Sequence, residues 1–220
     1  MSGLRALLFD LDGTLIDTAP EIAEALNRTL AWLGRAPASD AQVRAWIGDG
    51  ARALVGKALG EPATDTVWEH FAFEYAACCG TSSRLYPGVL DMLERLHARG
   101  VLLAVLTNKE AAFAHKLLAA HGITGCFDLL VAGDSLPFKK PDPRVVQHTL
   151  QALHLEPGDA AFVGDSVTDV RTARAAGVRA WIVRHGYPAG SFSGDDAPDA
   201  FIDGFAQFEP LQAAALRPIH

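Results

Sequence analysis

The feature that most constrains the fold of this 220-residue chain is a set of short apolar runs. Each run is four to six residues long and almost continuously apolar. Such runs are typical of strands that are buried on both faces of a parallel sheet. The runs are Ala6–Phe9, Val101–Leu106, Leu129–Ala132, Ala160–Val163 and Ala180–Val183.

Helical patterns separate most of these runs, and three of them end just before a glycine. A glycine in this place is expected at the C′ position of a helix. Strands that alternate with helices over residues 86–183 predict βαβ units, and hence an α/β fold with a doubly wound parallel sheet. The helical runs are Val89–Arg99, Ala111–His121 and Ser166–Ala176, followed by Gly100, Gly122 and Gly177.

Residues 18–80 do not follow this alternation. Thr18–Glu21 has the pattern of a capping box with an early proline, and Ser39 with Gln42 repeats the capping pattern. The stretch contains no convincing strand, so it predicts an all-helical insertion. The predicted helices run from Thr18 to about Leu33, over Val43–Leu54 and over Ala63–Cys79.

This organisation predicts two domains. Residues 1–17 and 83–220 form the α/β core, and residues 18–82 form a helical cap. The crossings near Ile16–Thr18 and Thr81–Leu85 are expected to act as hinges.

Charge and cysteine content exclude several classes of protein. The net charge is −7 and no basic stripe occurs, which argues against a duplex-binding nucleic-acid module. No apolar stretch is long enough to span a membrane, and Asp10 and Asp12 interrupt the apolar N-terminal run. The odd number of cysteines and the absence of CxxC favour a reducing compartment, so we expect a cytoplasmic protein. The cysteines are Cys78, Cys79 and Cys126.

Two carboxylates stand at the end of the first predicted strand. The strand period of two puts Asp10 and Asp12 on the same side, and Gly13 ends the strand. Ligands of open α/β sheets bind at such carboxyl ends. Because close carboxylates repel, one pKa is expected to rise, which suits a nucleophile beside a general acid/base.

These residues open a series of motifs that resembles the haloacid dehalogenase superfamily over essentially the whole chain. Asp10–Thr14 resembles the first motif, D-x-D-G-T. Leu106–Lys109 resembles the second, Lys140–Pro143 the third, K-P-x-P, and Gly164–Asp169 the fourth, G-D-S-x-x-D. All four stand in the family's order. The resemblance implies catalysis by phosphoryl transfer through an aspartyl-phosphate on Asp10, with Asp12 as general acid/base.

The same residues suit phosphate and metal binding. Thr107 and Asn108 offer donors at a helix N-terminus, and Lys140 rather than Lys139 would neutralise a phosphoryl oxygen. Gly13 and Thr14 are further candidate phosphate-binding residues.

Asp165 follows an apolar run and is expected to bind Mg²⁺ together with the Asp10 carboxylate and the Asp12 carbonyl. Asp169, one helical turn further, is expected to orient Lys140 or metal-bound water.

Asp12 favours a phosphatase or a phosphomutase, because family members that release halide lack an acid there. Three segments resemble bacterial phosphoglycolate phosphatases, so the expected substrate is a small phosphomonoester, 2-phosphoglycolate above all. Specificity is expected from the cap, with Gly48, Gly50 and Arg52, or Lys57 in its place, as candidates. The segments are Trp46–Gly50, Gly186–Pro188 and Ala200–Phe205.

Other functions stay open at this point. A hexose-phosphate phosphomutase or a sugar-phosphate phosphatase would keep the same four motifs. A non-catalytic, receiver-like phosphate-binding module is the alternative outside enzymes, although the helical insertion and Asp12 argue against it. A monomer and a homodimer are both compatible with the sequence. His185 is a further, weaker candidate to face the site.

Overall fold

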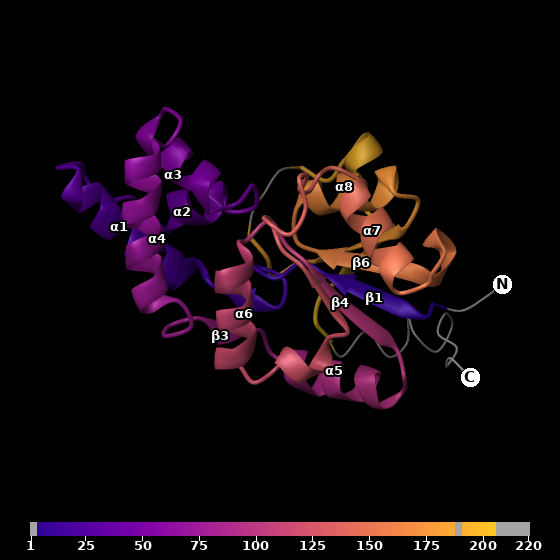
Figure 1. Cartoon of the computed structure of the whole chain (residues 1–220). Coiled ribbons are helices and arrows are strands. Elements are labelled where there is room, and N and C mark those ends of the chain that lie inside the picture. The colour runs from indigo at the N-terminus through magenta and orange to yellow at the C-terminus, as the bar shows by residue number, and fades with distance from the viewer. Residues whose placement is uncertain (1–3, 188–190, 206–220) are drawn as a thin grey trace.

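A six-stranded parallel sheet forms the centre of the molecule, in the order β5-β4-β1-β6-β7-β8 (Figure 1). The computed structural model describes residues 4–187 and 191–205. β1 lies in the middle, where Leu7 pairs in register with Leu103 on one side and Ala161 on the other. The strands are β1 (Ala6–Phe9), β4 (Leu102–Leu106), β5 (Leu129–Val131), β6 (Ala160–Gly164), β7 (Arg179–Val183) and β8 (Ala200–Ile202).

Alternate residues of each strand bury their side chains on opposite faces of the sheet. Leu7 and Phe9 pack with α5 and α6, whereas Ala6 and Leu8 pack with α7 and α8. Helices on both faces make the sheet doubly wound, which confirms the predicted fold class. The helices are α5 (Val89–Ala98), α6 (Ala111–Ala120), α7 (Arg144–Ala152) and α8 (Val167–Ala175).

The predicted C′ glycines follow the helices as expected. Gly100, Gly122 and Gly177 follow the C-caps of α5, α6 and α8, and all three have φ near +70°. A glycine adopts this conformation without steric cost, so each helix can stop and lead into the next strand.

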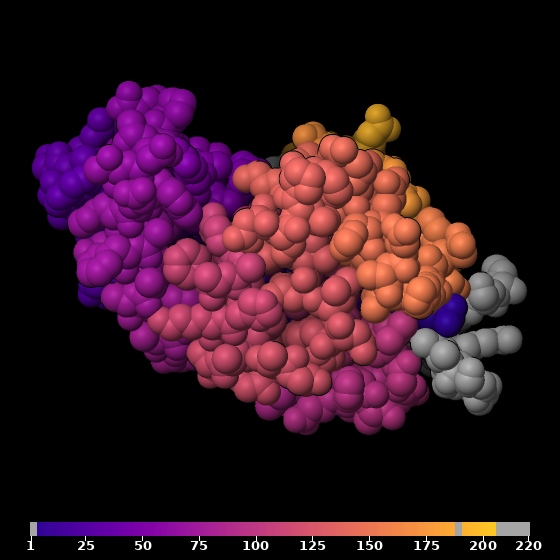
Figure 2. All heavy atoms as spheres, viewed as in Figure 1, coloured from indigo at the N-terminus to yellow at the C-terminus, as the bar shows by residue number. Residues whose placement is uncertain are grey.

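A four-helix cap lies at one side of the core, where its indigo and purple atoms form a lobe (Figure 2). Its longest helices, α1 and α4, pack along each other. A two-stranded antiparallel ribbon, β2 (Ile16–Asp17) with β3 (Arg84–Leu85), joins the two crossings between cap and core. The cap helices are α1 (Ala19–Trp32), α2 (Asp40–Trp46), α3 (Ala51–Leu59) and α4 (Asp65–Cys78).

Two local predictions for the cap were wrong. Thr18 makes no side-chain capping bond, because its hydroxyl donates to Asp12, and the Glu21 carboxylate bonds to other parts of the chain instead. The single helix expected over Val43–Leu54 is two helices, since the chain leaves helical geometry at Ile47 and turns through two glycines. The capping box of Ser39 and Gln42 is confirmed.

Other elements escaped the sequence patterns. β2 and β3 have two residues each, which is too short for a periodic signal, and β8 was not predicted. Three single turns of 3₁₀ helix complete the described structure: η1 (Thr124–Cys126), η2 (Pro157–Asp159) and η3 (Gly194–Asp196). No helix in the described ranges is long and apolar enough to cross a membrane.

Candidate active site

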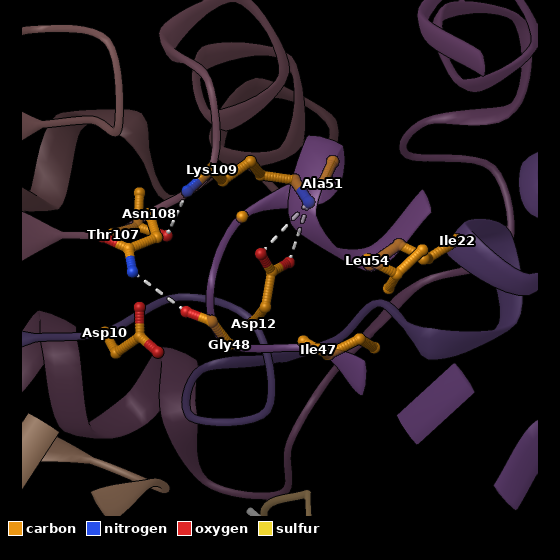
Figure 3. Close-up of a pocket in the computed structure, with 11 residues that line it drawn as sticks. Asp10, Asp12, Ile22, Ile47, Gly48, Ala51, Leu54, Thr107, Asn108 and Lys109 are labelled. Carbon is orange, nitrogen blue, oxygen red and sulfur yellow. Dashed lines mark hydrogen bonds and ion pairs between the residues drawn. The ribbon is translucent and has the colours of Figure 1, made fainter. Parts of the chain in front are cut away.

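A pocket lies between the carboxyl end of the sheet and the cap (Figure 3). The core lines it with polar and charged side chains. The cap contributes apolar side chains and the backbone of two glycines. The core residues are Asp10, Asp12, Thr107, Asn108 and Lys109, and the cap residues are Ile22, Ile47, Gly48, Gly50, Ala51 and Leu54.

Asp10 directly follows β1 and is 6% exposed. Its backbone N–H donates to the Val163 carbonyl, so the neighbouring strand β6 fixes its position. Its Oδ1 lies 2.8 Å from Nζ of Lys140. Burial raises the pKa of Asp10 to about 7, although the charge of Lys140 opposes the rise. The sequence-based expectation gave repulsion between Asp10 and Asp12 as the cause of a raised pKa, whereas burial is the largest cause at Asp10 and the charge of Asp12 adds less.

Lys140 is buried between two carboxylates. Its Nζ also lies 2.7 Å from Oδ1 of Asp169, and its pKa is raised because these anions outweigh the effect of burial. Oδ2 of Asp169 accepts from the backbone N–H groups of Asp165 and Ser166 and from the Ser166 hydroxyl. Asp169 is thus fixed by the start of α8 and holds the ammonium of Lys140 toward Asp10.

Asp165, at the end of β6, is enclosed by two glycines. A Cβ atom on Gly13 would lie 2.2 Å from Oδ2 of Asp165, and one on Gly186 would lie 2.1 Å from its Cβ. The Tyr187 N–H donates to Oδ2 at 2.7 Å. Burial and the negative charges of Asp169 and Asp10 hold the pKa of Asp165 well above its usual value.

Three carboxylates converge beside Lys140. Ligand atoms of Asp10, Asp165 and Asp169 lie within 4.8 Å of one another, and all three residues are buried. Three buried carboxylates against one lysine leave an excess of negative charge, and hard oxygen donors suit Mg²⁺. This donor set therefore fits a divalent cation.

Asp12 faces a different partner. Its two oxygens lie 3.0 and 3.1 Å from Nζ of Lys109, and Oδ1 also accepts from the Thr18 hydroxyl at 2.6 Å (Figure 3). Its side chain therefore points to the cap side of the pocket, away from the three-carboxylate cluster. The two aspartates of the first motif occupy separate electrostatic environments.

Lys109 is a site residue that the sequence reasoning missed. It is 4% exposed, and its Nζ also lies 4.8 Å from the ring centroid of Tyr75 in the cap. A lysine next to the phosphate-binding pair Thr107–Asn108 was a usable signal, because a charge at a buried strand end needs a partner.

The second motif also joins core and cap. Nδ2 of Asn108 donates to the carbonyls of Gly48 and Lys140, both at 3.0 Å, whereas its Oδ1 has no partner among the described residues. The Thr107 hydroxyl accepts from the Lys109 N–H. Thr14 is buried after Gly13, and its hydroxyl is also unpartnered within the part of the chain that is described.

The remaining candidates lie elsewhere. Arg52, Lys57 and Lys139 line a separate groove outside the pocket. Arg52 pairs with Asp65, and Lys57 pairs with Asp49. His185 contacts the Thr14 carbonyl through Nε2 and stacks near Tyr86 and Phe205, so it packs behind the first motif.

Known proteins are similar to this chain in amino-acid sequence. The chain is 40% identical to phosphoglycolate phosphatase 1 of Pseudomonas aeruginosa, over 96% of this chain and 82% of that protein. It is also 40% identical to the phosphoglycolate phosphatase of Nitrosospira multiformis, over 85% and 86% of the two chains.

Solved structures have the same fold as this chain. A predicted phosphoglycolate phosphatase from Haemophilus somnus superposes with a TM-score of 0.87 at 33% identity, covering 96% of this chain and 99% of that one. CbbY of Rhodobacter sphaeroides in complex with phosphate gives 0.77 at 25% identity, covering 93% and 96%. A family model for haloacid dehalogenase-like hydrolases matches residues 4–177. The chain therefore belongs to the haloacid dehalogenase-like hydrolases and is a phosphoric monoester hydrolase.

Proposed function

We propose that the enzyme hydrolyses 2-phosphoglycolate to glycolate and phosphate through an aspartyl-phosphate on Asp10. The observation that carries this proposal is the separation of the two aspartates. Asp10 contacts Lys140 beside the carboxylate cluster, whereas Asp12 contacts Lys109 and Thr18 at the cap side. This separation supports a division of roles, in which Asp10 attacks phosphorus and Asp12 protonates the leaving oxygen.

Mg²⁺ is the proposed cofactor, held by Asp10, Asp165 and the backbone carbonyl of Asp12. When bound, it would neutralise charge on the transferring phosphoryl group. Asp169 is assigned to Lys140 rather than to the metal, because Lys140 and three donors from residues 165–166 already engage its two oxygens.

The reaction proceeds in two in-line displacements. An oxygen of Asp10 bonds to phosphorus, and the bond from phosphorus to the glycolate oxygen breaks. Asp12, protonated for this step, gives its proton to the departing oxygen. It then takes a proton from the water that attacks phosphorus, which releases phosphate and restores the Asp10 carboxylate.

The phosphoryl group needs donors and positive charge around it. We assign these roles to Thr107, Asn108 and the backbone of Gly13 and Thr14, with Lys140 supplying the charge. Thr107 and Asn108 support this assignment, because both line the pocket.

The carboxylate of the leaving group is assigned to Lys109. Among the residues that line the pocket, Lys109 carries the positive charge, and the cap walls around it are apolar. Arg52 is less suited, because it lines the separate outer groove and not this pocket. A substrate carboxylate that is buried in the pocket requires a positively charged partner such as Lys109. The glycine turn at Gly48 and Gly50 leaves room for a short leaving group beside this cation.

The test compares three substrates: 2-phosphoglycolate, 2-hydroxyethyl phosphate and glucose 6-phosphate. The second has a leaving group of nearly the same size without a carboxylate. The wild-type enzyme should show the highest kcat/KM for 2-phosphoglycolate. A preference for glucose 6-phosphate would instead support a sugar-phosphate phosphatase, and its isomerisation without phosphate release would support a mutase.

Lys109→Met isolates the role of Lys109. It should lower the kcat/KM ratio of 2-phosphoglycolate to 2-hydroxyethyl phosphate by about 10- to 100-fold, the range of a lost charged hydrogen bond. Lys116→Met is the matched control, because Lys116 is exposed on α6, contacts the Ala76 carbonyl and does not line the pocket. It should keep the ratio. If Lys109→Met slows both substrates equally, Lys109 acts only through Asp12.

We also propose a cytoplasmic enzyme that acts as a monomer or a homodimer. The free thiols of Cys78, Cys79 and Cys126 support a reducing compartment. Light scattering of the purified protein would decide between the two oligomeric states.

A further inference from the structure

One tyrosine, outside the four motifs, contacts both the start of the cap and a carboxylate of the proposed metal site. Tyr187 is 3% exposed. Its hydroxyl accepts from the N–H groups of Thr18 at 2.8 Å and Ala19 at 2.9 Å, and it donates to Oδ1 of Asp17 at 2.9 Å. These bonds use both lone pairs and the proton of the phenol.

Tyr187 therefore supplies the cap of helix α1 from a distant part of the sequence. The first N–H groups of a helix need an acceptor, which the N-cap side chain normally provides. At α1 the N-cap residue Thr18 provides none, because its hydroxyl donates to Asp12. The orientation of the first cap helix is thus tied to the position of the Tyr187 ring.

The backbone of the same residue holds Asp165. The Tyr187 N–H donates to Oδ2 of Asp165 at 2.7 Å, and Gly186 packs so closely on Asp165 that an added Cβ would lie 2.1 Å away. Any displacement of residues 186–187 would therefore move the donor that orients this carboxylate.

The cap side of the contact is reinforced by an ion pair. Arg44 of α2 binds both oxygens of Asp17 at 3.1 and 3.2 Å, and its guanidinium lies 5.2 Å from the centroid of the Tyr187 ring. The side chain of Tyr187 thus contacts Asp17, Arg44 and the start of α1.

We propose that Tyr187 is a positioning residue that couples the orientation of the cap to the divalent-cation affinity at Asp165. The inference rests on the metal role proposed for Asp165. Coupling of this kind is reciprocal. A cap held in this position favours the orientation of Asp165 that binds the metal, and bound metal favours this position of the cap.

The first test is Tyr187→Phe, which keeps the ring and the backbone N–H but removes the hydroxyl. Mg²⁺ binding, measured by calorimetry without substrate, should weaken by about three- to tenfold, as for one lost hydrogen bond. Tyr75→Phe is the matched control. It removes another buried phenol hydroxyl, the one that donates to Glu21 in the cap. It should lower the Tm and leave the Mg²⁺ affinity unchanged.

The second test is a double-mutant cycle with Asp17, which lies in the ribbon outside the proposed metal ligands. Asp17→Asn should weaken Mg²⁺ binding when Tyr187 is present and should add nothing in the Asp17→Asn/Tyr187→Phe double variant. In the wild type, Mg²⁺ should also slow hydrogen exchange at the Thr18 and Ala19 amides, and Tyr187→Phe should abolish this effect.

Two results separate this inference from the proposed function. If the wild-type protein binds no Mg²⁺, the metal role of Asp165 is wrong. If the wild type binds Mg²⁺ and Tyr187→Phe binds it equally well with a lower Tm, the tyrosine is only structural and the coupling is overturned. Equal effects of Asp17→Asn in both backgrounds would overturn it as well.

Discussion

The core and cap walls of the pocket differ in polarity: charged and polar side chains line the core wall, and apolar side chains line the cap wall. On the core side, Asp10, Lys140 and Asp169 belong to a buried network whose contacts are 2.7 to 3.2 Å long. On the cap side, Ile22, Ile47 and Leu54 present apolar surface, and the charges of α3 point outward. The core thus presents charged groups to the pocket, and the cap presents an apolar wall.

This difference predicts that mutations in the core wall and in the cap wall affect activity in different ways. A buried charge network loses its function when any member changes, because its partners are left uncompensated. An apolar wall tolerates changes that keep its volume, so changes in the cap should alter which substrate binds rather than whether transfer occurs. Four variants test the contrast, beginning with the largest effect.

Asp10→Asn should have the largest effect. It removes the proposed attacking oxygen and weakens the contact with Lys140, so phosphate release from 2-phosphoglycolate should fall by at least about a thousandfold. The measurement is steady-state turnover of the folded variant, with the exposed Asp91→Asn as control. Near-normal turnover by Asp10→Asn would remove the covalent mechanism.

Gly186→Ala should have the next largest effect. Its added Cβ would lie 2.1 Å from Cβ of Asp165, so the carboxylate or the backbone must shift. A change next to a metal-binding carboxylate typically costs about 10- to 100-fold in affinity or activity. Both Mg²⁺ affinity and kcat should fall.

Gly158→Ala serves as the matched control, because an added Cβ there has nothing within 4 Å and its residue lies on the exposed η2 turn. It should behave like the wild type. Equal losses in both variants would mean that the effect of Gly186→Ala is a general backbone effect and not crowding of Asp165.

The sequence predicted the core side well. Buried strands can be identified from short apolar runs, and the candidate site residues follow those runs directly. Asp10, Thr107 and Asp165 are brought together because parallel strands end at one edge of the sheet. Here local pattern and three-dimensional position agree.

The cap side was predicted less well, because its geometry depends on contacts between residues far apart in sequence. The Thr18–Glu21 pattern indicates a capping box, yet Glu21 accepts from Tyr75, Gly80 and Ser83. The hydroxyl that caps α1 belongs to Tyr187. No local window contains both partners of these bonds.

The sequence also did not show which positively charged residue lies in the pocket. Arg52 was a reasonable candidate for a substrate carboxylate, since α3 borders the pocket. Asp65, thirteen residues later, pairs with it outside the pocket. The cation that lies inside, Lys109, comes from the core.

Gly48→Val should have a moderate effect, confined to specificity. Gly48 lines the pocket with φ of +128°, a conformation that a β-branched residue adopts with strain. The substituted turn should change the ratio of kcat/KM values for 2-phosphoglycolate and glucose 6-phosphate by about tenfold, as expected for one to two kcal/mol at the leaving group. The variant should still release phosphate from its substrates.

Gly60→Val is the control for strain alone. Gly60 also has a positive φ of +78° and open space around it, but it lies at the end of α3 away from this pocket. It should destabilise the cap without changing the substrate ranking. If Gly48→Val leaves the ranking unchanged, this turn has no part in specificity.

Arg44→Met should have the smallest effect, and its size depends on pH. Burial alone would raise the pKa of Asp17, but hydrogen bonds from Arg44 and Tyr187 outweigh it and hold this pKa below its usual value. A carboxyl group with a lowered folded-state pKa stabilises the fold above its unfolded pKa of about 4. That stabilisation is lost as the pH falls through the folded-state value.

The free energy of unfolding of Arg44→Met should therefore lie below that of the wild type by about 0.5 kcal/mol at pH 7, because both side chains are about one-third exposed. Below about pH 4 the difference should shrink, and it should approach zero once the pH lies below the lowered folded-state pKa of Asp17. Urea titrations at both pH values measure it, and Asp17→Asn provides a background in which Arg44→Met should have no pH-dependent effect. A difference that stays the same on acidification would mean that Arg44 stabilises the fold through the Tyr187 ring rather than through Asp17.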